Sequence, residues 1–212
     1  GKYTQILRDG MPLYGGFSGG LGLLQIAPLD LQQVELIKGS SSTLYGGGAI
    51  AGLVNLITKK PGAEPESSLL LNATSAGGID ASGFFSSMGQ SVGSSLFTSY
   101  NKSIAYDPAD NGFSAIPKFE RWTFNPRLFV EGSNSELRLG INAVIEDRIG
   151  GDMDYIEGNR INPAYFEKSS TERISTQIEY SSQWLSGNEF VFRNSINHYQ
   201  RDLNVPEFSF AG

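Results

Sequence analysis

The chain alternates apolar and polar residues over long stretches. In residues 136–146, apolar side chains occupy every second position, namely Leu137, Leu139, Ile141, Ala143 and Ile145. The same pattern recurs, strongly or weakly, in the segments 66–75, 80–89, 94–103, 121–130, 173–180 and 189–199. Successive side chains of a β-strand point to opposite faces, so this alternation predicts strands with one apolar and one polar face. We expect about seven strands, several of them ten residues or longer.

The length of these strands favours a membrane barrel. Strands of globular proteins have about 5–6 residues, whereas tilted strands that cross a bilayer need about 9–11. The connections also differ: those at 89–93, 132–135 and 185–188 are short, and those at 104–119 and 148–168 are long. Outer-membrane barrels have short periplasmic turns, longer extracellular loops and a polar interior, although the short connection near 76–80 departs from this rule. The alternative is a secreted β-sandwich, whose solvent-facing side is also polar.

Residues 1–60 follow another pattern, with short candidate strands between glycine-rich loops. Segments 34–38 and 54–60 are candidate strands, and residues 29–33 are expected to begin as a short helix. The proline-containing segment 61–66 predicts a linker between two parts of the chain. Contacts between the parts are expected from the polar face of the long strands, for example from Arg138 and Gln177.

Composition excludes several classes of function. The net charge of −6 argues against a nucleic-acid partner, because neutralising phosphates requires a basic surface. With no cysteine the chain can build no disulfide. Its one histidine, His198, falls on the same parity as Phe190, Phe192 and Ile196, which indicates a packed side chain, and we expect no catalytic centre. The chain starts at Gly1 rather than methionine, in what reads as the middle of a strand, so we expect it to be part of a longer protein.

The run LQQVELIKGSSSTLYGGGAIAGLVNLITKKP (31–61) resembles the end of the plug domain of TonB-dependent outer-membrane receptors. That family has a strand similar to VEVI(K/R)G, a turn of small residues, then LYG and GAIGGVVNIITK. The upstream run ILRDGMPLYGG (6–16) resembles the family's preceding strand and exposed loop. The resemblance implies a mainly β fold: a small mixed α/β plug, here residues 1–62, precedes a transmembrane antiparallel barrel of 22 strands. Residues 63–212 would supply about seven of those strands.

The resemblance also implies a receptor rather than an enzyme, in the outer membrane of a Gram-negative bacterium and in contact with outer-membrane lipid. It implies no cofactor. TonB of the TonB–ExbB–ExbD complex would be the partner, through a segment upstream of this chain. The ligand would be a scarce small nutrient such as a ferric siderophore or cobalamin. Residues 38–52 depart from the pattern of the starch-utilisation branch, which favours these ligands over glycans. The alternatives are an oligosaccharide- or peptide-importing receptor of the same family, and a passive barrel or β-rich surface adhesin without a plug.

Candidate binding residues follow from the resemblance. Two glycine-rich plug loops, 11–22 and 40–48, would face the extracellular cavity, where glycine lets the backbone approach a ligand closely. Their large side chains are the predicted substrate contacts: Leu13, Tyr14, Phe17 and Tyr45. Tyr45 could instead pack under its own loop. Lys38 occupies the place of a basic residue that pairs with barrel carboxylates in the family, and otherwise would be a solvated lysine.

Two weaker motifs compete with this interpretation. The run GGGAIAG (46–52) fits part of a dinucleotide fingerprint, but a strand follows it where that fingerprint requires a helix. Asp152, Asp154 and Glu157 offer oxygen ligands for calcium in a long loop, although their spacing is not that of an EF-hand. A solvated acidic loop is the simpler interpretation, so we expect no metal site.

Overall fold

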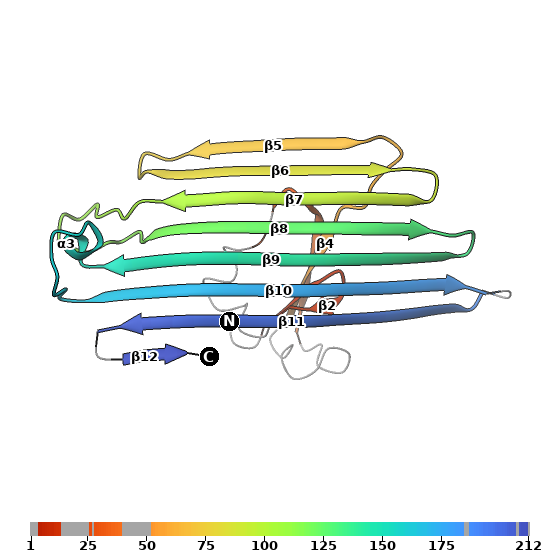
Figure 1. Cartoon of the computed structure of the whole chain (residues 1–212). Helices are drawn as coiled ribbons and strands as arrows, with labels where there is room; N and C mark the ends of the chain where they lie inside the picture. Colours follow the sequence, from red (N-terminus) through yellow and green to blue (C-terminus); the bar gives the residue numbers. More distant parts are fainter. Residues whose placement is uncertain are drawn as a thin grey trace.

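The computed structural model describes residues 4–13, 26, 28–39, 52–184, 187–206 and 208–211. Most of these residues form one large antiparallel sheet, which we call the wall (Figure 1). Its strands are β5 (Glu66–Ala73), β6 (Gly78–Met88), β7 (Val92–Ser103), β8 (Lys118–Glu131), β9 (Ser135–Gly151), β10 (Phe166–Gln183), β11 (Glu189–Val205) and β12 (Phe208–Ala211). Each strand pairs with its neighbour in sequence. The predicted set of about seven long strands corresponds to β5–β11, and β12 adds a short eighth one.

The two faces of the wall differ sharply in polarity. On the outward face, Trp122, Ile141 and Ile145 are 58%, 46% and 54% exposed. On the inward face, Asn125 and Arg173 are each only 2% exposed. Every arginine of β8–β11 falls on the inward parity: Arg121, Arg127, Arg138, Arg148, Arg173, Arg193 and Arg201. This arrangement, apolar outside and polar inside, is that of a membrane barrel and the reverse of a water-soluble sheet.

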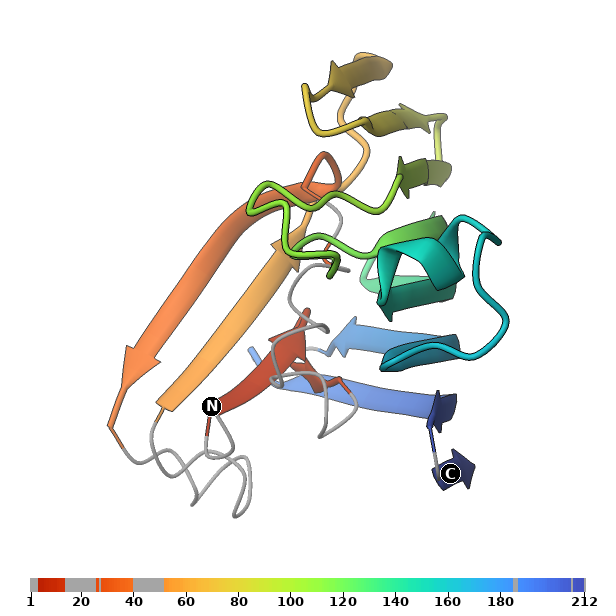
Figure 2. The same cartoon turned by 90° about the vertical axis from the view of Figure 1, so that its left-hand side faces the viewer.

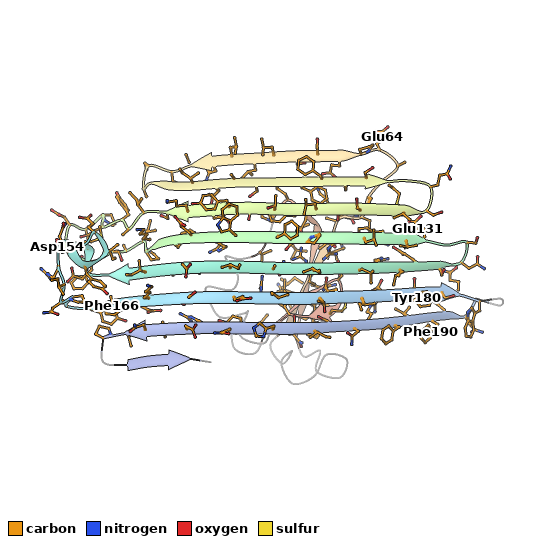
Figure 3. The ribbon with its side chains drawn as sticks, in the orientation of Figure 1. Glu64, Glu131, Asp154, Phe166, Tyr180 and Phe190 are labelled. Atoms are coloured by element: carbon orange, nitrogen blue, oxygen red, sulfur yellow. The ribbon has the colours of Figure 1, made fainter. Side chains whose placement is uncertain are left out.

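The connections separate the two ends of the wall. Tight turns after β6, β8 and β10 lie at one end, next to Tyr180 and Phe190, and the long loops lie at the other, next to Asp154 (Figure 3). The two long loops are bonded together: Met153 N donates to Gly112 O at 2.9 Å, and Gly151 N donates to Ser114 Oγ at 2.8 Å. One short helix, α3 (Met153–Ile156), lies in the second loop. No helix within the described ranges has the length and apolar content to cross a bilayer.

The N-terminal residues form a second, mixed sheet, which we call the plug sheet. Its order is β2 (Met11–Pro12), β1 (Thr4–Arg8), β4 (Gly52–Thr58) and β3 (Leu31–Lys38), and only the β1–β4 pair is parallel. Ile6, Leu13 and Leu56 form its core. At Gly52, where φ is +144°, a Cβ atom would lie 2.7 Å from Ile37 O, so the close β3–β4 pairing requires glycine.

The expected short helix at residues 29–33 was wrong. Pro28–Asp30 form a turn, and the strand β3 begins at Leu31. Antiparallel pairing of β3 with β4, from Leu31 opposite Thr58 to Lys38 opposite Gly52, supplies the backbone hydrogen bonds that a helical start would have provided locally. Tertiary pairing thus overrides the local preference.

The plug sheet lies against the inward face of the wall (Figure 2). The predicted polar contact is confirmed for Gln177, whose Nε2 on β10 donates to the backbone oxygen of Arg8 at 3.0 Å. For Arg138 it was wrong, because that guanidinium pairs with Glu136 and Glu179 of the wall itself. An apolar contact lies beside that of Gln177: Leu29 packs against the buried rings of Phe84 and Phe97 on the wall. The inward face is therefore occupied by another part of the same chain.

We expect a charge on the outward face to destabilise the folded protein. Ile141→Arg would place a cation in the middle of the apolar band, at a cost of about 2–4 kcal/mol at the bilayer midplane. The measurement is urea unfolding of the full-length protein in lipid vesicles. Ile161→Arg, in a loop position that is 91% exposed, is the matched control and should change little. Equal stability of both variants would contradict the outward assignment.

Candidate functional site

The first contact between plug and wall is an ion pair at the β1–β2 turn. Asp9, held in the left-handed region at φ +51°, accepts from the backbone N–H of Thr58 at 2.9 Å. Its other oxygen accepts from Arg127 Nη1, on β8, at 2.7 Å. Arg127 also donates to Thr58 Oγ1 and, at 3.1 Å, to Gln177 Oε1. Through Arg127 on β8 and Gln177 on β10, two wall strands are joined to the start of the β1–β2 turn and to β4.

The second contact is a chain of buried hydrogen bonds across three wall strands. Arg8 and Asp30, both in the plug part, form a buried ion pair. Asn125 Nδ2 on β8 donates to Asp30 Oδ2 at 3.1 Å, and Asn142 on β9 donates to Asn125 Oδ1. Arg173 Nη2 on β10 donates to Asn142 Oδ1 at 3.0 Å. The wall therefore contacts the plug ion pair through a neutral amide rather than through an opposite charge.

Two adjacent charged residues of the plug, Arg8 and Asp9, have shifted pKa values. Burial lowers the pKa of the Arg8 guanidinium, and the Asp30 carboxylate opposes that shift. Burial by itself would raise the pKa of Asp9. The charge of Arg127 and the hydrogen bonds from Thr58 and Arg127 outweigh burial, so the pKa of Asp9 lies below its ordinary value. Asp9 is therefore an anion at neutral pH and needs Arg127 as its counter-charge.

A cavity lies on each side of these contacts. The inner cavity, of about 320 Å³, lies between the plug sheet and the half of the wall with the tight turns; its charged lining includes Lys60, Arg138, Glu179 and Arg193. The outer cavity, of about 490 Å³, lies near the long loops and is lined by Pro28, Asp80, Ile116, Phe119, Arg121 and Arg148, among others. The outer cavity combines apolar surface with convergent polar groups, which is typical of a small-molecule site.

The chain is similar in sequence to known proteins. The family model for the TonB-dependent Receptor Plug Domain matches residues 1–53. The chain is 34% identical over 82 residues to the ferric aerobactin receptor of Klebsiella pneumoniae, covering 39% of this chain and 11% of that protein. It is 29% identical over 115 residues to the vitamin B12 transporter BtuB of Photobacterium profundum, covering 54% of this chain and 18% of that protein.

Solved structures match both the plug sheet and the wall together. The siderophore receptor PirA of Pseudomonas aeruginosa superposes with a TM-score of 0.64 at 18% identity, covering 96% of this chain and 34% of that one. The alcaligin receptor FauA of Bordetella pertussis gives 0.68 at 13% identity, covering 95% and 31%. Residues 1–53 carry the plug domain of TonB-dependent receptors, and barrel-like strands follow it. At these identities the solved structures show the fold alone, and the chain spans about a third of their length.

The plug domain and the barrel-like strands together indicate a fragment of a TonB-dependent receptor. TonB-dependent receptors are outer-membrane proteins that transport ligands and are not enzymes. The interpretation as an adhesin or a passive barrel, which would carry no plug, is therefore wrong for this chain. The secreted β-sandwich is excluded by the same match and by the exposed apolar face of the wall.

The predicted substrate contacts lie mostly outside the described residues. Tyr14, Phe17 and Tyr45 are in that group, so their role stays a prediction. Leu13 is 8% exposed and packs in the plug core, which leaves little of its side chain for a ligand. Lys38 is exposed at the end of β3 and, within the described part of the receptor, forms no ion pair. Its predicted pairing with barrel carboxylates stays a prediction.

The acidic loop is organised by an arginine. Asp152 Oδ2 accepts from Arg160 Nη1 at 2.7 Å and from the backbone N–H of Ala164 at 3.0 Å, and Asp154 accepts from Arg160 Nη2 at 3.0 Å. The backbone N–H of Ala164 is the main cause of the lowered pKa of Asp152. The guanidinium of Arg160 thus occupies the position a bound cation would take. Where side chains are described, no group of three or more histidine, cysteine or carboxylate residues is poised to hold a metal.

Apart from Gln177, sequence reasoning missed the residues that join plug and wall. Asn125, Arg127 and Asn142 lie on the polar parity that the alternation predicted, but nothing distinguishes them from their polar neighbours in sequence. Asp9 belongs to a recognisable Asp-Gly turn, and a carboxylate in such a turn could have indicated a position that binds a partner side chain.

We expect Arg127→Met to loosen the plug within the full-length receptor. The variant removes hydrogen bonds to a charged group, each contributing about 1.5–3 kcal/mol, and leaves the Asp9 carboxylate without its counter-charge. The measurement is the sensitivity of cells to vancomycin, which is too large for ordinary porins, with the surface level of receptor checked. Arg193→Met is the matched control, because Arg193 pairs with Glu179 on the wall itself. Equal sensitivity of the two strains would contradict a locking role for Arg127.

The Asp9 contact should weaken in acid. A carboxylate whose pKa is lowered in the folded state contributes stability that is fully present above its unfolded pKa of about 3.9. That stability is lost as the pH falls through the lowered folded value. The melting temperature of wild type should therefore exceed that of Asp9→Asn by a constant amount at neutral pH, and the difference should shrink as the pH falls below the unfolded pKa of about 3.9. A difference that stays constant throughout the acid range would show that Asp9 is not the titrating group.

Proposed function

We propose that this receptor imports a ferric siderophore or cobalamin across the outer membrane of a Gram-negative bacterium. The observation that carries the proposal is the plug sheet, which is bonded to the inward polar wall by few contacts, with a cavity of about 490 Å³ on the side of the long loops. Curated relatives with the names ferric aerobactin receptor and vitamin B12 transporter support this choice of ligands.

In this proposal, residues 1–62 belong to the plug and 63–212 to the barrel, and the outward apolar face contacts lipid. Ligand enters the outer cavity, and its passage requires the plug to move, because plug and wall are joined below that cavity. TonB of the TonB–ExbB–ExbD complex supplies the force from the periplasm. The chain's own residues do no covalent chemistry. They bind the ligand, hold the plug against the wall and release the plug when it is pulled.

The test is growth of a strain that lacks the gene for the full-length receptor. In iron-limited medium with single ferric siderophores, or in medium where growth requires cobalamin, the wild-type gene should restore growth with one ligand class. The same complementation in a strain lacking TonB is the matched control and should fail. Restoration without TonB would contradict active import. Failure with every siderophore and with cobalamin, alongside growth on an oligosaccharide or peptide, would assign the receptor to that alternative ligand class.

A further inference from the structure

Segments of both long loops meet at one buried acid, Asp152. The first long loop is residues 104–117 and the second is residues 152–165, and the structure describes both along their whole length. Asp152 opens the second loop and is 3% exposed. Its backbone N–H donates to Tyr165 O at 2.9 Å, and the residue forms a β-bridge with Phe113 of the first loop. A single residue thus joins both ends of the second loop to the first loop.

The carboxylate of Asp152 holds the interior of the second loop. One oxygen accepts from Arg160 Nη1 at 2.7 Å and from the backbone N–H of Ala164 at 3.0 Å, and the other accepts from the backbone N–H of Tyr155 at 3.4 Å. These donors come from three places along the loop. A buried carboxylate is costly to leave without donors, and hydrogen bonds to an ionised group are stronger than those between neutral groups. The loop is therefore held in one arrangement by one anion.

The second loop in turn holds the first, backbone against backbone. Met153 N donates to Gly112 O at 2.9 Å, and Ser114 N donates to Gly151 O at 2.9 Å. Gly151 N donates back to Ser114 Oγ at 2.8 Å. At Gly151, where φ is +116°, a Cβ atom would lie 2.5 Å from Tyr165 O, so this close approach requires glycine. The two loops therefore pack as one unit at the point where β9 ends.

The first loop carries this arrangement to the outer cavity. Tyr106 N donates to Ile116 O and Ala115 N donates to Tyr106 O, each at 3.0 Å. Ile116 and Pro117 line the outer cavity. The backbone of β9 lies directly against Pro117, because a Cβ atom at Gly150 would lie 3.3 Å from Pro117 Cβ. The position of this side of the cavity thus depends on a series of contacts that begins at Asp152.

We propose that Asp152 is a positioning residue for the outer cavity, and that the two long loops form a fixed rim rather than a lid that closes over the ligand. This proposal rests on the proposed import function, in which the ligand enters that cavity. Asp152 does not line the cavity and acts through the first loop, by keeping Ile116 and Pro117 in place before the ligand arrives. A preformed rim leaves nearly every receptor in the binding-competent arrangement, so little affinity is lost to the ordering of loops.

The first measurement is hydrogen–deuterium exchange of the purified full-length receptor in lipid nanodiscs, without ligand. Asp152→Ala should speed exchange in peptides that cover residues 106–116, in the other loop, about 10-fold or more, the equivalent of one hydrogen bond to a charged group. Asp152→Asn retains one acceptor oxygen and should have a smaller effect. Asp154→Ala is the matched control, because that carboxylate of the same loop is 55% exposed and contacts Arg160 rather than the first loop.

The second measurement is the rate of binding of three probes to the same variants: ferric tris-catecholate, a ferric tris-hydroxamate and cyanocobalamin. For the probe that wild type binds, Asp152→Ala should slow association about 10-fold and leave dissociation unchanged. The reason is that loosened loops only reduce the fraction of receptor in the binding-competent arrangement. Faster dissociation with unchanged association would indicate a closing lid and overturn the fixed rim.

The outcomes separate this inference from the proposed function. First-loop exchange that is equally fast in wild type, Asp152→Ala and Asp154→Ala would overturn the coupling of the loops, whatever the receptor binds. Faster exchange with both binding rates unchanged would overturn the positioning role and leave import intact. A properly folded wild type that binds none of the three probes would overturn the proposed ligands and the role of the rim together. If Asp152→Ala fails to reach the outer membrane, the same comparisons are made with Asp152→Asn.

Discussion

The architecture depends on keeping one strand register over the full height of the wall. Strands β9 and β10 pair without interruption from Ser135 opposite Ser182 to Gly151 opposite Phe166. Because side chains alternate between faces, a slip of one residue would move every arginine of a strand into the apolar face and every isoleucine inward. The only irregularity between β8 and β9 lies near Pro126, which has no N–H to donate to the ladder. Pro126 lies next to Asn125, so the interrupted ladder coincides with the place where the wall contacts the plug.

The contacts between plug and wall are built for release rather than for maximum strength. The buried ion pair of Arg8 and Asp30 lies wholly within the plug part, so it moves with the plug and need not be broken. The wall holds that pair with an amide of Asn125 and holds the backbone of Arg8 with an amide of Gln177. Of the contacts described between β8–β10 and the plug, two join opposite charges: the ion pair of Asp9 with Arg127, and the more exposed pair of Lys60 with Glu136. Separating two buried charges is far more costly than separating an amide from a carboxylate, so keeping most charge pairs on one side lowers the work of displacement.

Features that depend on neighbouring residues could be predicted from the sequence, whereas features that depend on distant partners could not. Alternation predicted the strands and their two faces, because apolar and polar residues follow one another at a period of two along each strand. Pro126 argues against an interior strand, yet β8 continues through it. The start of β3 at Leu31 was missed because pairing with β4, more than 20 residues away, decides it. The bonds of Asn125 to Asp30 and of Arg127 to Asp9 join residues about 100 positions apart. No local pattern specifies such partners. The motif around residues 31–61 gave the family, and only the three-dimensional pairing of plug and wall gives the contacts.

The position of the two cavities determines which part must move. Arg121 borders the outer cavity and Arg127 borders the inner one, and both lie on β8 with Asn125 between them. Six residues of strand span about 20 Å, so one rigid strand connects the outer cavity, the contact with the plug and the inner cavity. Strand β8 is hydrogen-bonded to β7 and β9 on its two edges and cannot shift without breaking both ladders. In the proposed import function, a ligand in the outer cavity therefore meets a fixed wall. The plug is held to that wall by a few side-chain contacts, so the plug is the element that we propose to move.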